Sequence, residues 1–254
     1  MPWKLFGRRH RSSAESWNIK TMFGPNLNFS TTEAYKLLRT NVMFSFVDSG
    51  EGHVIGITSA IQSEGKSSTA CNLAYALAES GSKVLLIGGD LRKPSVASKL
   101  GIARVPGLTN VLVGKFAPEE VVQKCDLASK LDIITAGDIP PNPSEMLSSE
   151  RMAELVKQLR KQYEYIVVDL PPVTVVSDTI AISKCLDGVI MVVRGGVSDE
   201  LMLAEAKRQL DLVNVRILGF VYRDQDAFGK KYSYRYRKKY YKYYHYYHEQ
   251  DKKK

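Results

Sequence analysis

The amino-acid sequence predicts an α/β fold, a doubly wound and mostly parallel sheet covered by helices on both faces. Two observations carry this prediction. Short β-branched runs alternate with longer helix-like segments between residues 53 and 222, which is the pattern of repeated strand–helix–strand units. Some of these runs are apolar at every position, as at 84–87 and 166–168, which indicates strands buried on both faces.

The elements follow in order along the chain. Six strands are predicted, at 54–58, 83–87, 131–135, 165–169, 188–193 and 216–222. Four helices are predicted between them, at 66–80, 148–162, 178–185 and 198–213. A further amphipathic helix is predicted over 31–46, with Thr31 or Thr32 as its N-cap. The apolar stripe of this helix is formed by Ala34, Leu37, Leu38 and Val42.

The positive charge is concentrated at the two ends of the chain. The formal net charge is +9, and residues 1–20 carry +4 while residues 229–254 carry +8. This distribution argues against a globular basic patch for nucleic acid. We expect a flexible basic segment over 1–30, one domain over 31–228 that includes a helix at 31–47, and a disordered tail from 229 onward. No membrane-spanning run and no secretory signal is found, so a cytoplasmic location is expected.

A phosphate-binding loop is predicted between the first strand and the helix that follows it. Residues 58–68 nearly match G-x-x-x-x-G-K-[ST], with Ala60 in place of the first glycine. In such a loop, backbone N–H groups surround an anion, Lys66 reaches the β- and γ-phosphates, and the Ser67 hydroxyl reaches Mg²⁺. The fold is therefore expected to be that of a P-loop nucleoside triphosphatase. The predicted nucleotide contacts are Ser63, Glu64, Gly65, Lys66, Ser67 and Ser68.

Two aspartates are expected at the same edge of the sheet. Asp90 follows the second predicted strand, and Asp169 closes the fourth. The carboxyl ends of parallel strands are where ligands bind in open α/β sheets, and Mg²⁺ needs only one or two protein carboxylates beside phosphates and water. A lone aspartate at a strand end is more often a cap or turn residue, but the shared edge favours a metal role for Ser67, Asp90 and Asp169.

Three further stretches carry a resemblance to a known family. They are Asp-Leu-Arg-Lys-Pro at 90–94, the segment 136–145 and Tyr-Ile-Val-Val-Asp-Leu-Pro-Pro at 165–172. These motifs resemble those of the bacterial tyrosine kinases of capsule and exopolysaccharide synthesis, over about 31–222. The resemblance implies a protein-tyrosine autokinase with ATP and Mg²⁺ as cofactors. It implies catalytic roles for Lys66, Asp90, Arg92 and Asp169.

The resemblance also implies an assembly and its partners. Glu33, Lys36 and Arg39 resemble the self-association motif E-x-x-R-x-x-R, through which the family forms a ring; a solvated polar helix face is the alternative interpretation. A transmembrane activator, or polysaccharide co-polymerase, is expected to hold the kinase at the inner face of the plasma membrane. A cognate tyrosine phosphatase is a further expected partner, and nucleic acid is not.

The chain departs from the family pattern at three places. Gln62 and Ser63 stand where Pro-Gly is usual, so Ser63 is expected to avoid the backbone region that only glycine adopts. Gly88 replaces the first aspartate of a D-x-D motif, the family's candidate base, and general-base help is worth about 10²–10⁴-fold in rate. Asp90 is a candidate replacement. Arg223 stands where an asparagine near the adenine is usual.

Arg92 matches the family motif and is expected to support the γ-phosphate edge of the site.

The C-terminal tail is rich in tyrosine and basic residues. Stacking on single-stranded nucleic acid and binding to an anionic membrane are two interpretations. Phosphorylation is the third, and it explains why every aromatic in the cluster is tyrosine. The nine tyrosines are Tyr232, Tyr234, Tyr236, Tyr240, Tyr241, Tyr243, Tyr244, Tyr246 and Tyr247.

Two other functions compete with the kinase hypothesis. One is a nucleotide-binding scaffold that has lost transfer activity, which the glycine at 88 motivates. The other is a partitioning-type ATPase, but that class carries an extra lysine early in its phosphate loop, and residues 59–65 contain none. The tyrosine cluster also has no role in such a protein.

Overall fold

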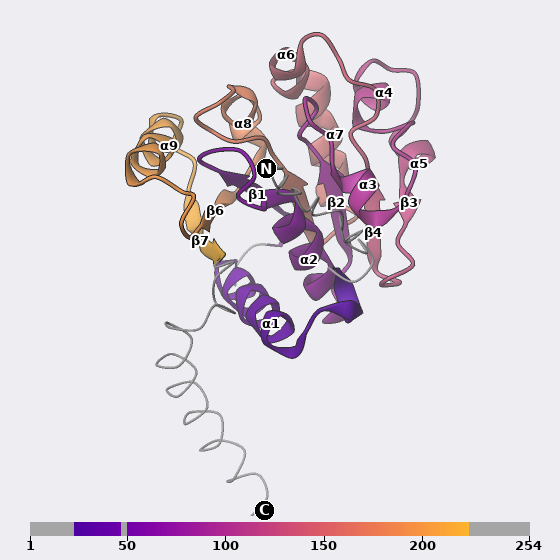
Figure 1. Ribbon diagram of the computed structural model, residues 1–254. Helices are drawn as coiled ribbons and strands as arrows, with labels where there is room; N and C mark the ends of the chain where they lie inside the picture. Colours follow the sequence, from indigo (N-terminus) through magenta and orange to yellow (C-terminus); the bar gives the residue numbers. More distant parts are fainter. Residues whose placement is uncertain (1–22, 47–49, 224–254) are drawn as a thin grey trace, which may run out of the picture.

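The computed structural model describes residues 23–46 and 50–223. These residues form a seven-stranded sheet with helices on both faces (Figure 1). The strand order is β3-β4-β2-β5-β1-β6-β7, and every neighbouring pair is parallel except β3 with β4. The predicted doubly wound, mostly parallel sheet is confirmed. The segments 1–22 and 224–254, which include the tyrosine cluster, lie outside the described residues.

The bounds of the elements agree closely with the sequence pattern where segments are long. The strands are β1 His53–Ser59, β2 Val84–Gly88, β3 Gln123–Lys124, β4 Leu131–Ile134, β5 Tyr165–Asp169, β6 Gly188–Arg194 and β7 Ile217–Arg223. The longer helices are α1 Phe29–Phe44, α2 Lys66–Glu79, α7 Glu150–Arg160 and α9 Glu200–Leu212. The short helices are α3 Val96–Leu100, α4 Leu108–Leu112, α5 Pro118–Val121, α6 Pro143–Leu147 and α8 Asp178–Ala181.

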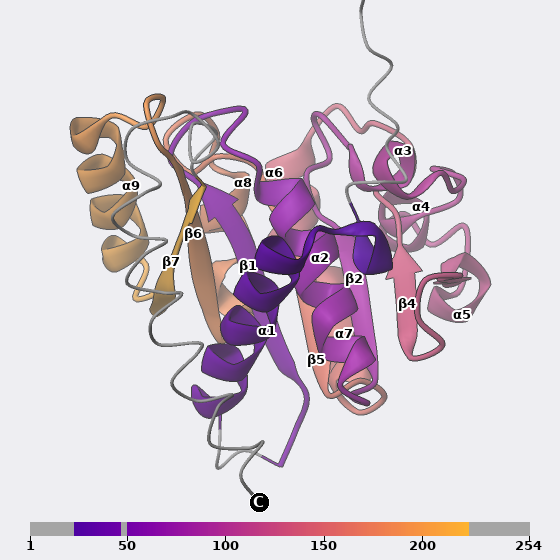
Figure 2. The same ribbon diagram turned by 60° about the horizontal axis from the view of Figure 1, so that its bottom comes forward.

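The core is divided between the two faces of the sheet because strand residues alternate in direction. Figure 2 shows α1 and α2 in front of the strands, and on that face Ile55, Leu86 and Val167 pack with α2. On the other face, Ile87 and Val168 pack with α7 and α4, while α9 covers β6. Within 23–46 and 50–223, no helix is long and apolar enough to cross a membrane.

The first helix begins earlier than predicted, and its faces are partly exchanged. Asn28, not Thr31 or Thr32, is the N-cap, since its side chain accepts a hydrogen bond from the Thr31 N–H at 2.9 Å. Leu37, predicted in the apolar stripe, is 54% exposed, and Ala34 is exposed as well.

The cause of this exchange is a contact between α1 and α2. Arg39, predicted on the polar face, donates to the Ala76 carbonyl of α2 at 3.1 Å, so its side of the helix is turned inward together with Val42. Lys36 forms an ion pair with Glu33 at 2.9 Å within the same helix. The three residues of the predicted self-association motif thus lie along one side of α1, and one of them contacts its own domain.

The domain also begins earlier than the predicted boundary at residue 31. Phe23 is 4% exposed and belongs to the core of the α2 face. The Gly24 N–H donates to the buried Asn72 side chain of α2 at 3.2 Å. Phe23 and Gly24 are therefore packed against the domain and lie outside the predicted boundary at residue 31.

Replacing Phe23 with alanine is expected to lower the free energy of unfolding by about 3 kcal/mol, because a buried aromatic ring is removed from a packed core. Urea unfolding followed by circular dichroism measures this change. Phe29→Ala is the matched control, since Phe29 is 65% exposed and its loss is expected to change stability by less than about 0.5 kcal/mol. Equal effects of the two substitutions would contradict the revised boundary.

Candidate active site

The phosphate loop lies at the carboxyl end of β1 and opens directly into α2. Gly65 has φ +97°, a left-handed conformation that glycine adopts readily, and it precedes the first turn formed by Lys66, Ser67 and Ser68. Within the described residues, the backbone N–H groups at 62–65 have no hydrogen-bond acceptor. Four adjacent donors without partners at a helix N-terminus are suited to an anion.

The loop is held in shape by a buried carboxylate of its own. Glu64 is fully buried, and its side chain accepts a hydrogen bond from the Ile61 N–H at 2.8 Å. Its other carboxylate oxygen accepts from the Ser198 hydroxyl, in the connection between β6 and α9. A buried charge is tolerated only when it is hydrogen-bonded, so Glu64 is a structural anchor of the loop. Its predicted direct contact with nucleotide stays a prediction.

Ser63 adopts a left-handed backbone conformation. Its φ is +64°, in the left-handed region, where a side chain costs roughly 1–2 kcal/mol relative to the right-handed region. The loop keeps the glycine-like conformation although the glycine has been replaced. The left-handed region favours glycine but is open to other residues at this cost, so the φ of Ser63 does not contradict the expectation that it avoids the region that only glycine adopts.

Asp169 lies where three parallel strands meet. In the sheet register, Asp169 of β5 is opposite Ile57 of β1 on one side and Gly88 of β2 on the other. Its carboxylate is 1% exposed, and neither oxygen has a hydrogen-bond partner of ordinary geometry. Burial raises the pKa of Asp169 to about 7, although the ammonium of Lys66 and the hydroxyl of Ser67 oppose the rise. A buried carboxylate with two free oxygens beside a phosphate loop is suited to a cation.

Lys66 and Asp90 are brought together by the structure. The Lys66 ammonium lies 3.3 Å from Asp90 Oδ2, and both side chains are largely buried. Asp90 Oδ1 accepts a hydrogen bond from the Lys93 N–H at 2.9 Å. Both oxygens of Asp90 are thus engaged, so a role as metal ligand or base requires Lys66 to move from Asp90 to a phosphate.

Arg92 is placed differently from its predicted role. Its guanidinium forms two hydrogen bonds of 2.9 Å with the carboxylate of Asp178, a fully buried residue at the start of α8. The Ser144 hydroxyl donates to the same carboxylate at 2.5 Å. Arg92 therefore joins the segment after β2 to α6 and α8. Support of a γ-phosphate by Arg92 stays a prediction, and it requires this ion pair to open.

Two arginines at the ends of β6 and β7 contact the phosphate loop. Arg223 donates to the Glu64 carbonyl at 3.4 Å, and its guanidinium lies against Gly65, where a Cβ atom would be 1.5 Å from Nη1. Arg194 donates to the Ser63 carbonyl at 3.0 Å. Arg223 was predicted near the nucleotide, whereas Arg194 was not predicted; the one signal for Arg194 in the sequence is its position at the carboxyl end of a strand.

The glycines after β2 differ in the space around them. A Cβ atom at Gly89 would lie 2.8 Å from Val168 and 3.0 Å from the Asp169 carbonyl, so a side chain does not fit there. At Gly88 the nearest atom would be the Ala136 backbone nitrogen at 3.1 Å. A side chain at 88 is therefore tight but feasible with a small shift. By register it would lie on the same face of the sheet as Asp169.

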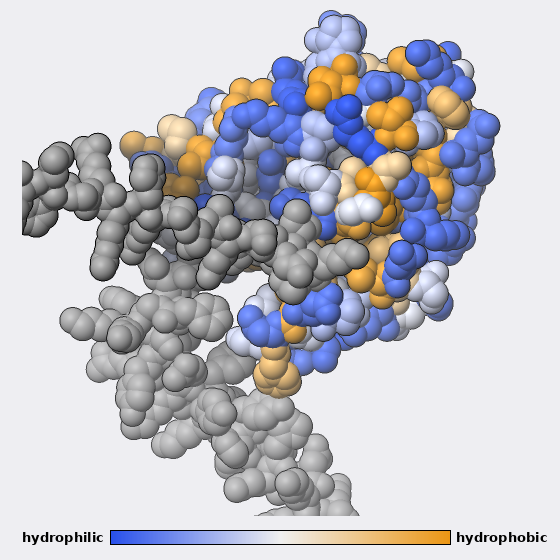
Figure 3. All heavy atoms as spheres, turned by 45° about the vertical axis from the view of Figure 1, so that its right-hand side comes forward, coloured by the Kyte–Doolittle hydropathy of each residue, from blue (hydrophilic) through white to orange (hydrophobic). Residues whose placement is uncertain are grey.

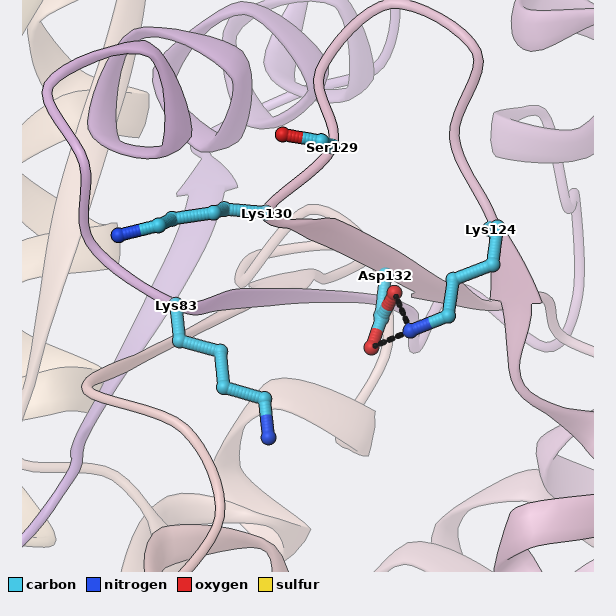
Figure 4. A pocket seen from close by; sticks show the side chains of 5 residues that line it. All are labelled: Lys83, Lys124, Ser129, Lys130 and Asp132. Atoms are coloured by element: carbon cyan, nitrogen blue, oxygen red, sulfur yellow. Dashed lines mark hydrogen bonds and ion pairs between the residues drawn. The ribbon is translucent and has the colours of Figure 1, made fainter.

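A separate pocket of about 250 Å³ lies at the opposite end of the strands. Lys83, Lys124, Ser129, Lys130 and Asp132 line it. Figure 4 shows that the three lysines do not converge: Lys124 points to Asp132, whereas Lys83 and Lys130 point in different directions. Figure 3 shows apolar residues in separate groups among polar ones on the visible face. Neither feature competes with the phosphate loop as the active site.

The loop with its free amides, the largely buried Lys66 and the buried Asp169 define a P-loop nucleotide-binding domain. A family model described as AAA domain matches residues 52–197. The tyrosine-protein kinase YwqD of Bacillus subtilis is 39% identical over 215 residues, which cover 84% of this chain and 89% of that protein.

Solved structures show the same fold. The kinase domain of the Escherichia coli tyrosine kinase ETK aligns with a TM-score of 0.76 at 29% identity, over 90% of this chain and 88% of that one. MinD of Pyrococcus horikoshii, solved as a complex with Mg-ADP, aligns with a TM-score of 0.57 at 25% identity, over 66% of this chain and 69% of that one. The chain spans less than a third of longer tyrosine-protein kinases that it also matches. The chain belongs to the bacterial tyrosine kinase family, as its motifs predicted.

Replacing Ser63 with glycine is expected to raise the free energy of unfolding by about 1 kcal/mol, because glycine adopts a positive φ without steric cost. Urea unfolding of both proteins measures the difference. Ser129→Gly is the control: Ser129 has no positive φ, so glycine there is expected to lower stability by about 0.4–1 kcal/mol. A destabilised Ser63→Gly variant would contradict the strain assigned to this position.

Proposed function

We propose that this chain is an ATP-dependent protein-tyrosine autokinase that phosphorylates the tyrosine cluster of its own tail and thereby regulates capsule and exopolysaccharide synthesis and export. The observation that carries the proposal is the set of free backbone N–H groups at 62–65 beside Lys66 and Asp169. Membership of the tyrosine kinase family supplies the reaction class, and the tail supplies the acceptors.

In this proposal, different residues of the site bind the phosphates and the magnesium ion during phosphoryl transfer. The loop amides and Lys66 would hold the phosphates in place, which is most of what this reaction needs from a protein. Asp169 and Ser67 would hold Mg²⁺, and Asp90 would join them once Lys66 has turned to the phosphates. When bound, Mg²⁺ neutralises charge that develops on the phosphates. Arg92 and Arg223 complete the proposed nucleotide site.

The buried Asp169 supports the magnesium assignment. Neither of its oxygens has a hydrogen-bond partner of ordinary geometry, and burial disfavours its charged form, so a divalent cation would satisfy both needs. No group of three or more His, Cys, Asp or Glu able to hold a metal occurs in 23–46 and 50–223. Magnesium would therefore depend on nucleotide phosphates and water for its remaining ligands, as is usual for this ion.

We propose that tail phosphorylation occurs between subunits of a ring. Helix α1 presents large apolar side chains to solvent, and these supply a surface for a neighbouring copy beside Glu33, Lys36 and Arg39. The exposed apolar residues are Phe29, Leu37, Met43 and Phe44. The transmembrane activator would hold the ring at the inner face of the plasma membrane, and a tyrosine phosphatase would reverse the reaction.

A catalytically weak scaffold is the second candidate, and Gly88 is the observation that favours it. No carboxylate is present at 88, and both oxygens of Asp90 are engaged. General-base help is worth about 10²–10⁴-fold, so its loss slows transfer but leaves nucleotide binding intact.

The kinase proposal is tested with the full chain, Mg-ATP and the cytoplasmic segment of the activator. Phosphotyrosine within 232–247 is expected by mass spectrometry, and Lys66→Met is expected to reduce it at least 100-fold, because the phosphates lose their charged partner. Lys130→Met is the matched control, since Lys130 lies at the opposite end of the sheet. Absence of ATP-dependent phosphate in this segment would overturn the kinase proposal and favour the scaffold.

Gly88→Asp is expected to raise kcat for tail phosphorylation at least tenfold, because it adds a carboxylate on the face of the sheet that carries Asp169. The tight contact with Ala136 is expected to lower stability at the same time. Initial rates at saturating Mg-ATP measure the first effect and urea unfolding the second. An unchanged kcat in a folded variant would show that the missing carboxylate does not limit this enzyme.

A further inference from the structure

Two arginines lie side by side at the outer surface of the phosphate loop. Arg194 of β6 and Arg223 of β7 are direct partners in the parallel register. Like charges placed next to each other across neighbouring strands are unfavourable. A compensating set of acceptors is therefore expected, and the carbonyl groups of the phosphate loop supply part of it.

The arginines bind successive carbonyl groups of the loop. Arg194 donates to the carbonyl of Ser63 at 3.0 Å, and Arg223 donates to the carbonyl of Glu64 at 3.4 Å. The N–H groups of the same two residues have no acceptor within the described chain. Each carbonyl shares a peptide plane with the N–H of the next residue, so fixing the carbonyls also fixes the amides of Glu64 and Gly65.

The two arginines restrain the loop at a point where its backbone is strained. Ser63 has φ +64°, and such a conformation persists only when surrounding contacts impose it. The connection after β6 adds a third contact. The Ser198 hydroxyl donates to the buried Glu64 carboxylate and accepts a hydrogen bond from the backbone N–H of Arg194 at 2.7 Å. The ends of β6 and β7 thus restrain the loop from one side.

We propose that Arg194 and Arg223 are positioning residues that hold the phosphate loop in its anion-binding conformation by binding the carbonyls of Ser63 and Glu64. Both act through the loop backbone. Arg223 is also part of the nucleotide site proposed above, whereas Arg194 has no role in that proposed function. The inference rests on that proposed function, since it requires the loop to bind nucleotide phosphates. It goes further by explaining how a serine is accommodated where glycine is the natural choice.

The test measures nucleotide affinity and turnover separately in the full chain. Arg194→Gln is expected to raise the Kd for Mg-ATPγS, and the KM for ATP, about tenfold, while kcat at saturating ATP changes less than twofold. Arg208→Gln is the matched control: Arg208 lies on the exposed side of α9, paired with Glu205, and is expected to change neither value. Thermal unfolding without nucleotide confirms that each variant is folded.

Repeating the measurement in the Ser63→Gly variant distinguishes positioning of the loop from direct contact with nucleotide. In Ser63→Gly protein the loop needs less restraint, so Arg194→Gln is expected to raise Kd only about threefold. An unchanged Kd, a fall in kcat at unchanged KM, or an undiminished tenfold loss in the glycine background would each overturn the inference. Failure of the proposed function is distinguishable, because wild-type protein would then bind no Mg-ATPγS or transfer no phosphate to the tail.

Discussion

The parallel register of β5 between β1 and β2 is the constraint on which the site depends. It places Asp169 beside Gly88 and at the level of the strand that leads into the phosphate loop. Because both faces of these strands are covered by helices, the carboxylate has no access to water. The same packing that stabilises the sheet therefore produces a carboxylate whose charge needs a cation, next to a loop whose amides need an anion.

Positive side chains contact the site from two sides, one in the interior and one at the surface. Inside, Lys66 pairs with Asp90 and lies close enough to Asp169 to oppose its raised pKa. Outside, Arg194 and Arg223 contact the carbonyl side of the loop. Phosphates bound by the loop would meet the positive charge of Lys66 and the free backbone N–H groups of the loop. The buried Glu64 connects the loop to the segment after β6.

The sequence predicted the sheet and the longer helices well because their apolar patterns extend over several turns or pleats. It missed the two-residue strand β3 and the helices α3, α4, α5 and α6, since elements of two to five residues show no period. It predicted the faces of α1 only in part: Leu38 and Val42 face the core as predicted, but Arg39 is also turned inward and donates to the Ala76 carbonyl, which no periodicity reveals. For the site, the loop was predicted from its motif and both aspartates from their positions at strand ends, whereas the pairing of Arg92 with Asp178 and the contact of Arg194 depend on tertiary packing.

Hydrogen–deuterium exchange of the full chain, with and without Mg-ATPγS, tests the central claim most directly. The account predicts slower exchange at the amides of 62–68 when nucleotide and magnesium are both present, because free donors become hydrogen-bonded. It predicts little change at the lysine-lined pocket around Lys83 and Lys130. Protection at that pocket with none in the loop, or no protection anywhere at saturating nucleotide, would contradict the assignment of the phosphate loop as the active site.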